Sequence, residues 1–451
     1  MRARFLRAIG NLRESYWFVP AVMAAVALLL AVGLVYADAH YTSDWFERVA
    51  WLQAGRPDGA RSLLMAVAGS MIGVAGTTFS VTIAAVVYAS GQYGPRLLSN
   101  FMADRGNQLT LGTFIATFLY SVVVVRTIRS PGESGLGDGG FVPQLALLVA
   151  LLLVLASIAV LIFFIHHVPR RIHINSVIEQ IGRRLVDEIE HRFPDTRSPA
   201  AASGATPMPA HGLTSWVTAA GTGYVQIVDH RALVDIAKDA DIVVQLKCQP
   251  GDFVHPRTVL AEVFSRSICD EALLGRLSGA FALGSRRTPM QDLRFLVDEL
   301  VEIAARALSP GVNDPFTARS CMDWLAAALA EAAQRPDPSV AITDCDDRMR
   351  VLCRPTSFAL LVERSFGALA QYASADMIAG QHYLRSICEI LLICDDPVRV
   401  SLLRARIEAF KELSDTQLSG VNARSVSDRA TLILDRIGDR DALRRTRYEM
   451  E

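Results

Sequence analysis

Small and hydroxyl-bearing residues recur at helical spacing along one apolar stretch of the chain. They are Gly69, Ser70, Gly73, Gly76, Thr77 and Ser80. At 100° per residue, the three glycines and Ser80 would lie within about 60° of one another on a helix. Small residues let helix backbones approach closely, and hydroxyl groups form hydrogen bonds between helices in lipid. The stripe therefore predicts either tight helix packing, inside a bundle or between protomers, or the uncharged wall of an oligomeric pore lined by Ser70, Thr77 and Ser80.

A second group of polar residues could bind an ion or a small polar ligand. It consists of Asp292, Glu299, Arg306, Asn313 and Asp314. Two of these residues also have a structural interpretation, because Asp314 can cap a helix that starts at Pro315 and Asn313 tolerates a left-handed turn. We favour the structural interpretation for this loop, while the binding interpretation stays open.

Catalytic and metal-binding motifs are absent from the sequence. It has no G-x-S-x-G, H-E-x-x-H or Walker motif and no catalytic Ser-His-Asp order. The seven cysteines include no C-x-x-C pair and all lie at position 248 or beyond, so we expect reduced thiols rather than disulfides or a zinc site. His166, His167 and His173 lie around Pro169 and are interpreted as histidines at a membrane interface. The sequence thus predicts a protein that is not an enzyme and that has no metal or cofactor.

The elements that carry these residues follow from the distribution of charge. The chain has 45 basic and 46 acidic residues, yet only 11 arginines and 8 acidic residues lie in the first 169 positions. Uncharged runs of 20 to 34 residues interrupt this region, and a helix needs about 20 apolar residues to cross a membrane. The runs predict four transmembrane helices at about 17–36, 64–88, 109–127 and 143–167.

The charges also exclude some classes of protein and set an orientation. Because no ionisable residue lies deep in a span, a proton-coupled carrier is disfavoured, and the net charge of −1 argues against binding to nucleic acid. Basic residues of the N-terminal tail and Arg170 and Arg171 flank the first and last spans on one side. The positive-inside rule then predicts a multi-pass protein of a bacterial inner membrane with both termini in the cytoplasm.

The remaining chain has the composition of an ordinary globular protein. We expect the second span to end in a turn at Ser90-Gly91, and the helix after the fourth span to continue with a kink at Pro169. The predicted order is a basic cytoplasmic tail (1–16), a four-helix transmembrane domain (17–168), a cytoplasmic helical extension (169–193), a linker (194–212), a small β module (213–264) and a mainly α-helical cytoplasmic domain (265–451).

Local patterns place elements within the last two domains. Strands are expected at 224–228, 241–246 and 258–264, with a helix at 231–238. Thr288 followed by Pro289 and Gln291 forms a capping-box arrangement, which predicts a helix that runs to about Leu308.

Further start signals predict the other helices of the α-helical domain. Asp314-Pro315 and Asp396-Pro397 mark two helix starts, and the first of these helices is expected to extend to about Gln334. Ser425 with Asp428 is expected to open another helix. We thus expect six or seven helices before a charged tail at 440–451.

Several motifs together resemble one known family. Arg287-Thr288, Gln291-Asp292, the string Ala307 to Ala318 and the segment Tyr88 to Arg96 are similar to the bacterial predicted-membrane-protein family catalogued as domain of unknown function twenty-two fifty-four. The likeness covers nearly the whole chain. It implies a four-span inner-membrane protein with a large cytoplasmic part, and it implies no activity.

Three functions are consistent with these patterns. The first is a homo-oligomeric channel-like or transport-related protein that conducts a small ion through the lipid bilayer and has a cytoplasmic gating or assembly domain. The alternative is a membrane-anchored scaffold or sensor whose cytoplasmic domain binds a partner. The third, which the missing motifs disfavour, is an enzyme at the membrane face with a pocket around Asp292 to Asp314.

Overall fold

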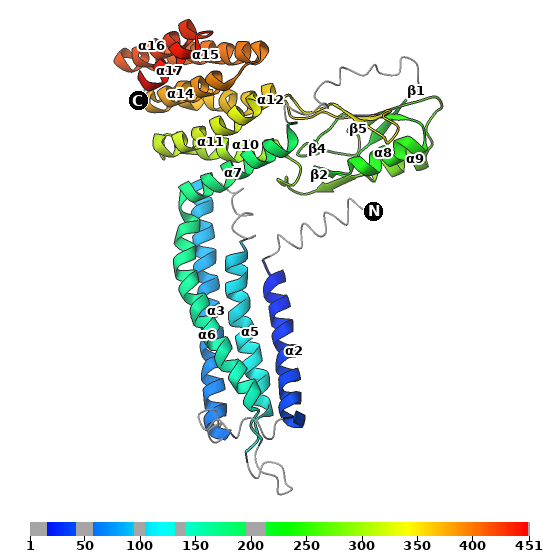
Figure 1. Ribbon diagram of the computed structural model, residues 1–451, viewed down its shortest axis with the longest axis vertical. Helices are drawn as coiled ribbons and strands as arrows, with labels where there is room; N and C mark the ends of the chain where they lie inside the picture. Colours follow the sequence, from blue (N-terminus) through cyan, green and yellow to red (C-terminus); the bar gives the residue numbers. More distant parts are fainter. Residues whose placement is uncertain (1–15, 42–56, 94–103, 131–140, 195–212, 450–451) are drawn as a thin grey trace. The chain divides into compact units, whose positions relative to one another are not determined.

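The structure is a computed structural model that describes residues 16–41, 57–93, 104–130, 141–194 and 213–449. The chain forms two compact units, which divide at His173 (Figure 1). The unit before this residue consists of apolar helices in its described part. The unit after it combines small β-sheets with many helices. This order confirms the predicted fold class in outline: apolar N-terminal helices, then small sheets, then a mostly helical C-terminal region.

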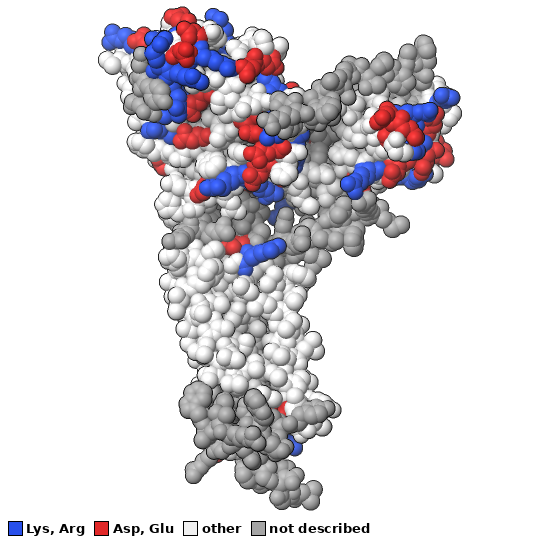
Figure 2. Space-filling view, viewed as in Figure 1, with Lys and Arg blue, Asp and Glu red and all other residues white. Residues whose placement is uncertain are grey.

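Four long apolar helices make up most of the first unit. They are α2 (Phe18–Tyr41), α3 (Pro57–Tyr93), α5 (Arg105–Thr127) and α6 (Gln144–Ile172). Each contains at least 23 consecutive residues that are apolar enough to cross a membrane. On the face shown in Figure 2, the visible described surface of this unit carries very few charged side chains. The four spans expected from the uncharged runs therefore exist as helices.

The helix α5 is the centre of this unit, because it packs against α2, α3 and α6. Its buried face carries the hydroxyl groups of Thr110, Thr113, Thr117 and Ser121, each of which donates to the carbonyl oxygen four residues earlier at 2.8 Å. The Oγ1 atom of Thr117 also lies 3.0 Å from the Oγ atom of Ser157 on α6. Hydrogen bonds as well as apolar packing thus hold the interior of the bundle together.

Polar contacts are present near both ends of α6. At its N-terminus, the carboxylate of Asp38 accepts hydrogen bonds from the backbone N–H groups of Leu145 and Ala146 at 3.1 and 2.9 Å, where the helix dipole favours negative charge. Near its C-terminal end, Nε2 of His167 lies 2.8 Å from Oδ2 of Asp104. His167 lies near the C-terminal end of α6, and its pairing with Asp104 was not predicted from the sequence.

One expected helix end is wrong, and the helix after the fourth apolar run is interrupted later than Pro169. The helix α3 continues through Ser90-Gly91 and ends at Tyr93, so the turn expected at Ser90-Gly91 does not form. The helix α6 passes through Pro169, and the chain leaves helical geometry at His173, where ψ is 124°. A new helix, α7 (Ile174–Arg192), follows. The predicted linker at 194–212 lies, except for its first residue, outside the described residues.

Two β-sheets form one end of the second unit. A five-stranded sheet has the order β1-β5-β3-β8-β7, and a three-stranded sheet has the order β4-β2-β6. The strands are β1 (Leu213–Thr218), β2 (Gly223–Val228), β3 (Val243–Leu246), β4 (Phe253–Val254), β5 (Val259–Ser265), β6 (Phe281–Gly284), β7 (Ala341–Thr343) and β8 (Met349–Leu352). The expected strands at 224–228, 241–246 and 258–264 correspond to β2, β3 and β5, and the expected helix at 231–238 is α8 (His230–Asp239).

The predicted β module is too short, because three strands come from the region expected to be helical. β6 pairs with β2, and β8 pairs in parallel with β3, with Val351 next to Val244. Both valines are fully buried. Strands of three or four residues are too short to show a clear alternation of apolar and polar residues, so the sequence pattern did not separate them from the helices around them.

An ion pair stabilises the β7–β8 hairpin and gives it a predicted pH dependence. Nε of Arg350 donates to Asp344 Oδ2 at 2.7 Å, and this bond lowers the pKa of Asp344 from its usual value of 3.8 to about 2. Because the pKa is lower in the folded protein, the stabilisation is present above pH 4 and is lost as the pH falls towards 2. We expect the urea midpoint of the wild type to fall more steeply over this range than that of Asp344→Asn. Parallel curves would contradict this role.

Helices make up the rest of the second unit. They are α9 (Glu271–Ser278), α10 (Leu293–Ala307), α11 (Pro315–Ala333), α12 (Phe358–Val362), the π-helical segment η4 (Glu363–Gly367), α13 (Ala368–Ala373), α14 (Met377–Ile393), α15 (Pro397–Gln417), α16 (Gly420–Arg436) and α17 (Arg440–Glu449). These exceed the six or seven helices expected. Both Asp-Pro starts are confirmed, at α11 and α15.

The other expected starts differ from the structure. The helix expected at Pro289 begins at Leu293, with Asp292 in the cap position, and Thr288 Oγ1 is buried without a hydrogen-bond partner among the described residues. Ser425 lies inside α16, which begins at Gly420. The expected charged tail is the helix α17, whose Leu443 is buried.

Candidate functional sites

The six small residues of the first group lie on one exposed face of α3. The face is wider than the sequence stripe: between Ser62 and Ala84, every residue of α3 in a sector of about 120° is Gly, Ala, Ser or Thr, and all are exposed. We call this sector the small face. Its members are Ser62, Ala66, Gly69, Ser70, Gly73, Gly76, Thr77, Ser80 and Ala84. It extends for about 33 Å along the helix, a length close to the thickness of the hydrocarbon layer of a membrane.

The small face points away from the other helices of its own unit. The side of α3 that packs against them carries Leu64, Ala75 and Thr82, which are buried, and at 100° per residue this side is about 150° from the glycines. A Cβ atom added to Gly69, Gly73 or Gly76 would meet no atom within 4 Å. Packing of the stripe inside the bundle, one of the two packing interpretations, is therefore wrong, and packing between protomers stays a prediction.

The hydroxyl groups of the small face donate hydrogen bonds to backbone carbonyl groups of their own helix. Ser70, Thr77 and Ser80 donate to the carbonyl oxygens of Ala66, Gly73 and Gly76 at 2.7, 3.1 and 2.9 Å. Each hydroxyl has one donor and two acceptor lone pairs. What the three groups offer to their surroundings is therefore acceptor capacity, which suits a cation better than an anion.

The second group of polar residues does not form a single site. Asp292 precedes the first turn of α10, and Arg306 lies 14 positions later in its last turn, so their backbones are about 21 Å apart. Asn313 and Asp314 lie just beyond the Arg306 end. A small ligand bound at one end of α10 would not touch residues at the other, so these five residues fall into two separate clusters, with Glu299 buried between them.

Asp292 belongs to a buried network of charges. Nε and Nη2 of Arg287 donate to Asp292 Oδ2 at 2.8 and 2.6 Å, and Nη1 donates to Asp298 Oδ2 at 2.6 Å. Asp298 in turn accepts two hydrogen bonds of 3.1 Å from Arg364 on η4. Burial lowers the pKa of Arg287, but the charges of the two aspartates outweigh this effect and raise it above its ordinary value. The network therefore keeps Arg287 charged and links α10 to η4.

The same network attaches the helices to the β strands. Nη2 of Arg294 donates to the carbonyl oxygen of Pro250 at 2.6 Å and to Asp252 Oδ1 at 2.9 Å. Gly251 between them has φ +93°, and a Cβ atom there would lie 1.9 Å from Asp292 Oδ2. Glycine is thus required for both the turn conformation and the close approach of the carboxylate. The contacts assign Asp292 a structural role at the junction between sheet and helices.

The Asn313-Asp314 loop has the geometry of a helix start. Asn313 adopts a left-handed conformation with φ +50°. Asp314 Oδ1 accepts hydrogen bonds from the N–H groups of Phe316 and Thr317 at 3.2 and 3.1 Å, and Oδ2 accepts one from the Thr317 hydroxyl at 2.6 Å. These are the contacts of an N-cap, and they occupy both carboxylate oxygens of Asp314.

The cysteine thiols are free, and most are poorly placed for chemistry. All seven lack disulfides, and Cys248, Cys321, Cys388 and Cys394 are buried. Burial raises the pKa of Cys248 to about 12 and that of Cys353 to about 11, so both thiols are protonated near neutral pH and weakly nucleophilic. Among the described residues, no group of three His, Cys, Asp or Glu residues is arranged to hold a metal ion.

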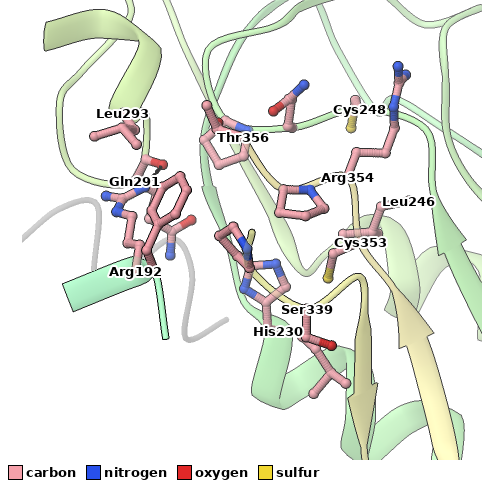
Figure 3. A pocket seen from close by; sticks show the side chains of 16 residues that line it. Arg192, His230, Leu246, Cys248, Gln291, Leu293, Ser339, Cys353, Arg354 and Thr356 are labelled. Carbon is pink, nitrogen blue, oxygen red and sulfur yellow. Dashed lines mark hydrogen bonds between the residues drawn. The ribbon is translucent and has the colours of Figure 1, made fainter. Parts of the chain in front are cut away.

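A cavity in the second unit was missed by the sequence analysis. Its volume is about 350 Å³, and residues from α7, α8, the β3–β4 turn and the β7–β8 hairpin line it (Figure 3). The side chains of His230, Cys353 and Arg354 lie around it. The lining residues are spread from Arg192 to Thr356 in the sequence, and no local motif connects them, so only the folded chain reveals the site.

Four apolar helices followed by a unit of sheets and helices are typical of a membrane protein with a large part outside the membrane. The chain belongs to the family described as "Predicted membrane protein (DUF2254)", whose profile matches residues 13–388. The resemblance seen in the sequence motifs is thus confirmed. Uncharacterised proteins of Mycobacterium bovis and Mycobacterium tuberculosis are 28% identical to this chain over 438 residues, which are 95% of this chain and 82% of each relative. No solved structure is significantly similar to the chain.

Proposed function

We propose that the protein is a homo-oligomeric, channel-like protein of the bacterial inner membrane that conducts a small cation. In this proposal, the small faces of α3 from several copies meet around a common axis. Both termini lie in the cytoplasm, because the basic residues next to the first and last spans favour that side. The second unit then forms a cytoplasmic gating or assembly domain.

The observation that carries the proposal is the exposed position of the small face. The outward surfaces of α2 and α6 carry large apolar residues such as Leu29, Val32 and Leu155, which suit contact with lipid chains. The small face presents nothing larger than threonine over a full membrane thickness. Small residues are typical of surfaces where helices approach closely, so a second copy of α3, rather than lipid, suits this face.

The cation preference follows from the hydroxyl groups. The hydroxyl hydrogens of Ser70, Thr77 and Ser80 bind backbone carbonyls, so their oxygen lone pairs face the proposed axis. Rings of oxygen acceptors from several copies would replace part of the hydration shell of a cation. An uncharged lining of this kind favours conduction over tight binding.

Ion flux through liposomes tests the proposal. Purified full-length protein in liposomes is expected to conduct K⁺, and Thr77→Val, which removes an acceptor from the small face, is expected to change the conductance. Thr78→Val is the matched control, because the adjacent Thr78 is buried on the opposite side of α3 and should leave conductance unchanged in an assembled protein. Absence of flux for any small ion, with or without membrane tension, would overturn the proposal.

The cavity of the second unit favours a second function, a membrane-anchored sensor. A sensor needs a ligand site outside the membrane, and the cavity has the volume of one. The two functions differ in one measurement: a sensor without a conduction path would bind a ligand and give no ion flux. The sensor interpretation also requires no contact between small faces.

A further inference from the structure

The cavity of the second unit has the size of a ligand site. At about 350 Å³, it lies within the range of about 300–1,000 Å³ typical of small-molecule sites. Elements distant in the sequence build it: Arg192 ends α7, His230 begins α8, and Arg354 follows β8. A ligand there would bridge the sheet, the β7–β8 hairpin and α7.

The lining of this cavity is basic. It contains Arg192, His230 and Arg354, and none of its residues is acidic. Arg192 is partly neutralised by Glu188, with Nη2 and Oε2 2.7 Å apart. Arg354 donates through Nη1 to the carbonyl oxygen of Lys247 at 3.1 Å, and no carboxylate of the described residues forms an ion pair with it. The charge of Arg354 is therefore available to an anion.

Two polar side chains of the lining, those of His230 and Thr356, lie at other points of the wall than the Arg354 guanidinium (Figure 3). Neither the imidazole of His230 nor the hydroxyl of Thr356 forms a hydrogen bond within the described part of the chain. Burial lowers the pKa of His230, so its ring is neutral near pH 7 and carries one donor N–H group. The hydroxyl of Thr356 can add a second neutral donor.

Most of the remaining wall is apolar, and its other polar side chains are those of Gln249, Gln291 and Ser339. Phe193, Leu246, Leu293 and Ile342 line the cavity together with several prolines. A simple inorganic ion would leave these surfaces in contact with water, whereas an organic body would cover them. The complementary ligand therefore has one anionic group and an apolar or aromatic body.

We propose that this cavity binds a small organic anion, a carboxylate or phosphate attached to an apolar body, and that Arg354 pairs with the anionic group. Arg354 provides a charge-assisted contact, and the apolar wall covers the body. This site is separate from the small face of α3, so the inference does not depend on the proposed channel function.

Calorimetric titration of the full-length protein in an uncharged detergent tests the proposal with three probes. Phenyl phosphate carries both parts of the ligand, inorganic phosphate carries only the anion, and phenol carries only the body. We expect phenyl phosphate to bind more tightly than the other two. Arg354→Gln should weaken its binding by about 10- to 100-fold, the loss expected for a hydrogen bond to a charged group. Arg348→Gln is the matched control, because Arg348 is an exposed arginine of the same hairpin and does not line the cavity.

Alkylation of native cysteines provides a second readout that requires no variant. Cys353 lines the cavity and Cys345 is exposed outside it. Phenyl phosphate is expected to slow the reaction of Cys353 with N-ethylmaleimide and to leave the rate at Cys345 unchanged. Equal affinity for phenol and phenyl phosphate, unchanged binding by a folded Arg354→Gln protein, or no protection of Cys353 would each overturn the proposal.

Discussion

Replacing Arg287 by methionine is expected to destabilise the second unit by about 3–5 kcal/mol, the cost of breaking a buried ion pair by removing one partner. The guanidinium of Arg287 forms ion pairs with both Asp292 and Asp298, and the side chain of Asp292 is only 1% exposed. Without Arg287, Asp292 Oδ2 would lose both of its charge-assisted hydrogen bonds. Methionine keeps much of the volume, so the loss would report mainly on the charge of the guanidinium, which also lies 5.5 Å from the centre of the Phe295 ring.

Urea unfolding of the full chain in detergent measures this effect, with the fluorescence of Trp216 and Trp324 as the signal of the second unit. Arg404→Met is the matched control: Arg404 pairs with Glu408 at 3.1 Å, but both side chains are half exposed. An exposed pair of this kind is expected to contribute less than about 1 kcal/mol. A loss at Arg287 no larger than that at Arg404 would contradict the role of the network.

A double variant tests whether the lost stability comes from the unpaired charge of Asp292 or from the changed shape of the Arg287 side chain. In Arg287→Met with Asp292→Asn, the second substitution removes the carboxylate that the first leaves without its main partner. Because Asp298 still has Arg364, we expect the double variant to recover part of the lost stability. If the two losses simply add, then burial of an unpaired charge is not the main cause.

Asp-Pro helix starts and charge gaps were the reliable signals in the sequence, because both act locally. The four long apolar helices could be predicted from uncharged runs alone, since a helix that crosses a membrane requires about 20 such residues whatever their partners. The starts of α11 and α15 were predictable because Asp314 and Asp396 bond to N–H groups only two or three residues away. Such contacts need no information from distant parts of the chain.

Contacts outside the local sequence patterns explain two of the errors. The capping box at Thr288 was a valid local pattern, but Arg287 binds Asp292, and Gln291 binds the backbone of Val228 through its side chain. These contacts hold the segment outside a helix until Leu293. In the same way, β8 forms a strand because β3, about 100 residues earlier, provides its neighbour.

The direction of the small face also required the structure. Periodicity placed the three glycines on one side of a helix, but α3 is apolar on every side, so the pattern did not tell which side meets the bundle. Leu64, Ala75 and Thr82 are among the residues of α3 that are buried. The small face is part of the side of α3 that remains exposed, which also carries large apolar residues such as Leu63, Met65 and Ile72.

Replacing Gly73 by leucine is expected to disrupt assembly of the protein while leaving each protomer folded. A Cβ atom at Gly73 meets nothing within 4 Å in the single chain, so the leucine fits within the protomer. Across two facing α3 helices, the added side chain would force the backbones apart. Overpacking of this kind typically costs about 1–3 kcal/mol, which corresponds to a roughly 5- to 150-fold weaker association.

Gly33→Leu is the matched control, because Gly33 on α2 is equally exposed and also has no atom within 4 Å of its added Cβ. It makes the same substitution on a helix that the proposal places in contact with lipid. Light scattering of the purified proteins in detergent, and crosslinking in membranes through Gly73→Cys, measure the assembly. The native cysteines all lie at position 248 or beyond, so a crosslink at position 73 is readily assigned. If both leucine variants assemble like the wild type, α3 does not meet a second copy, and the pore proposal fails with it.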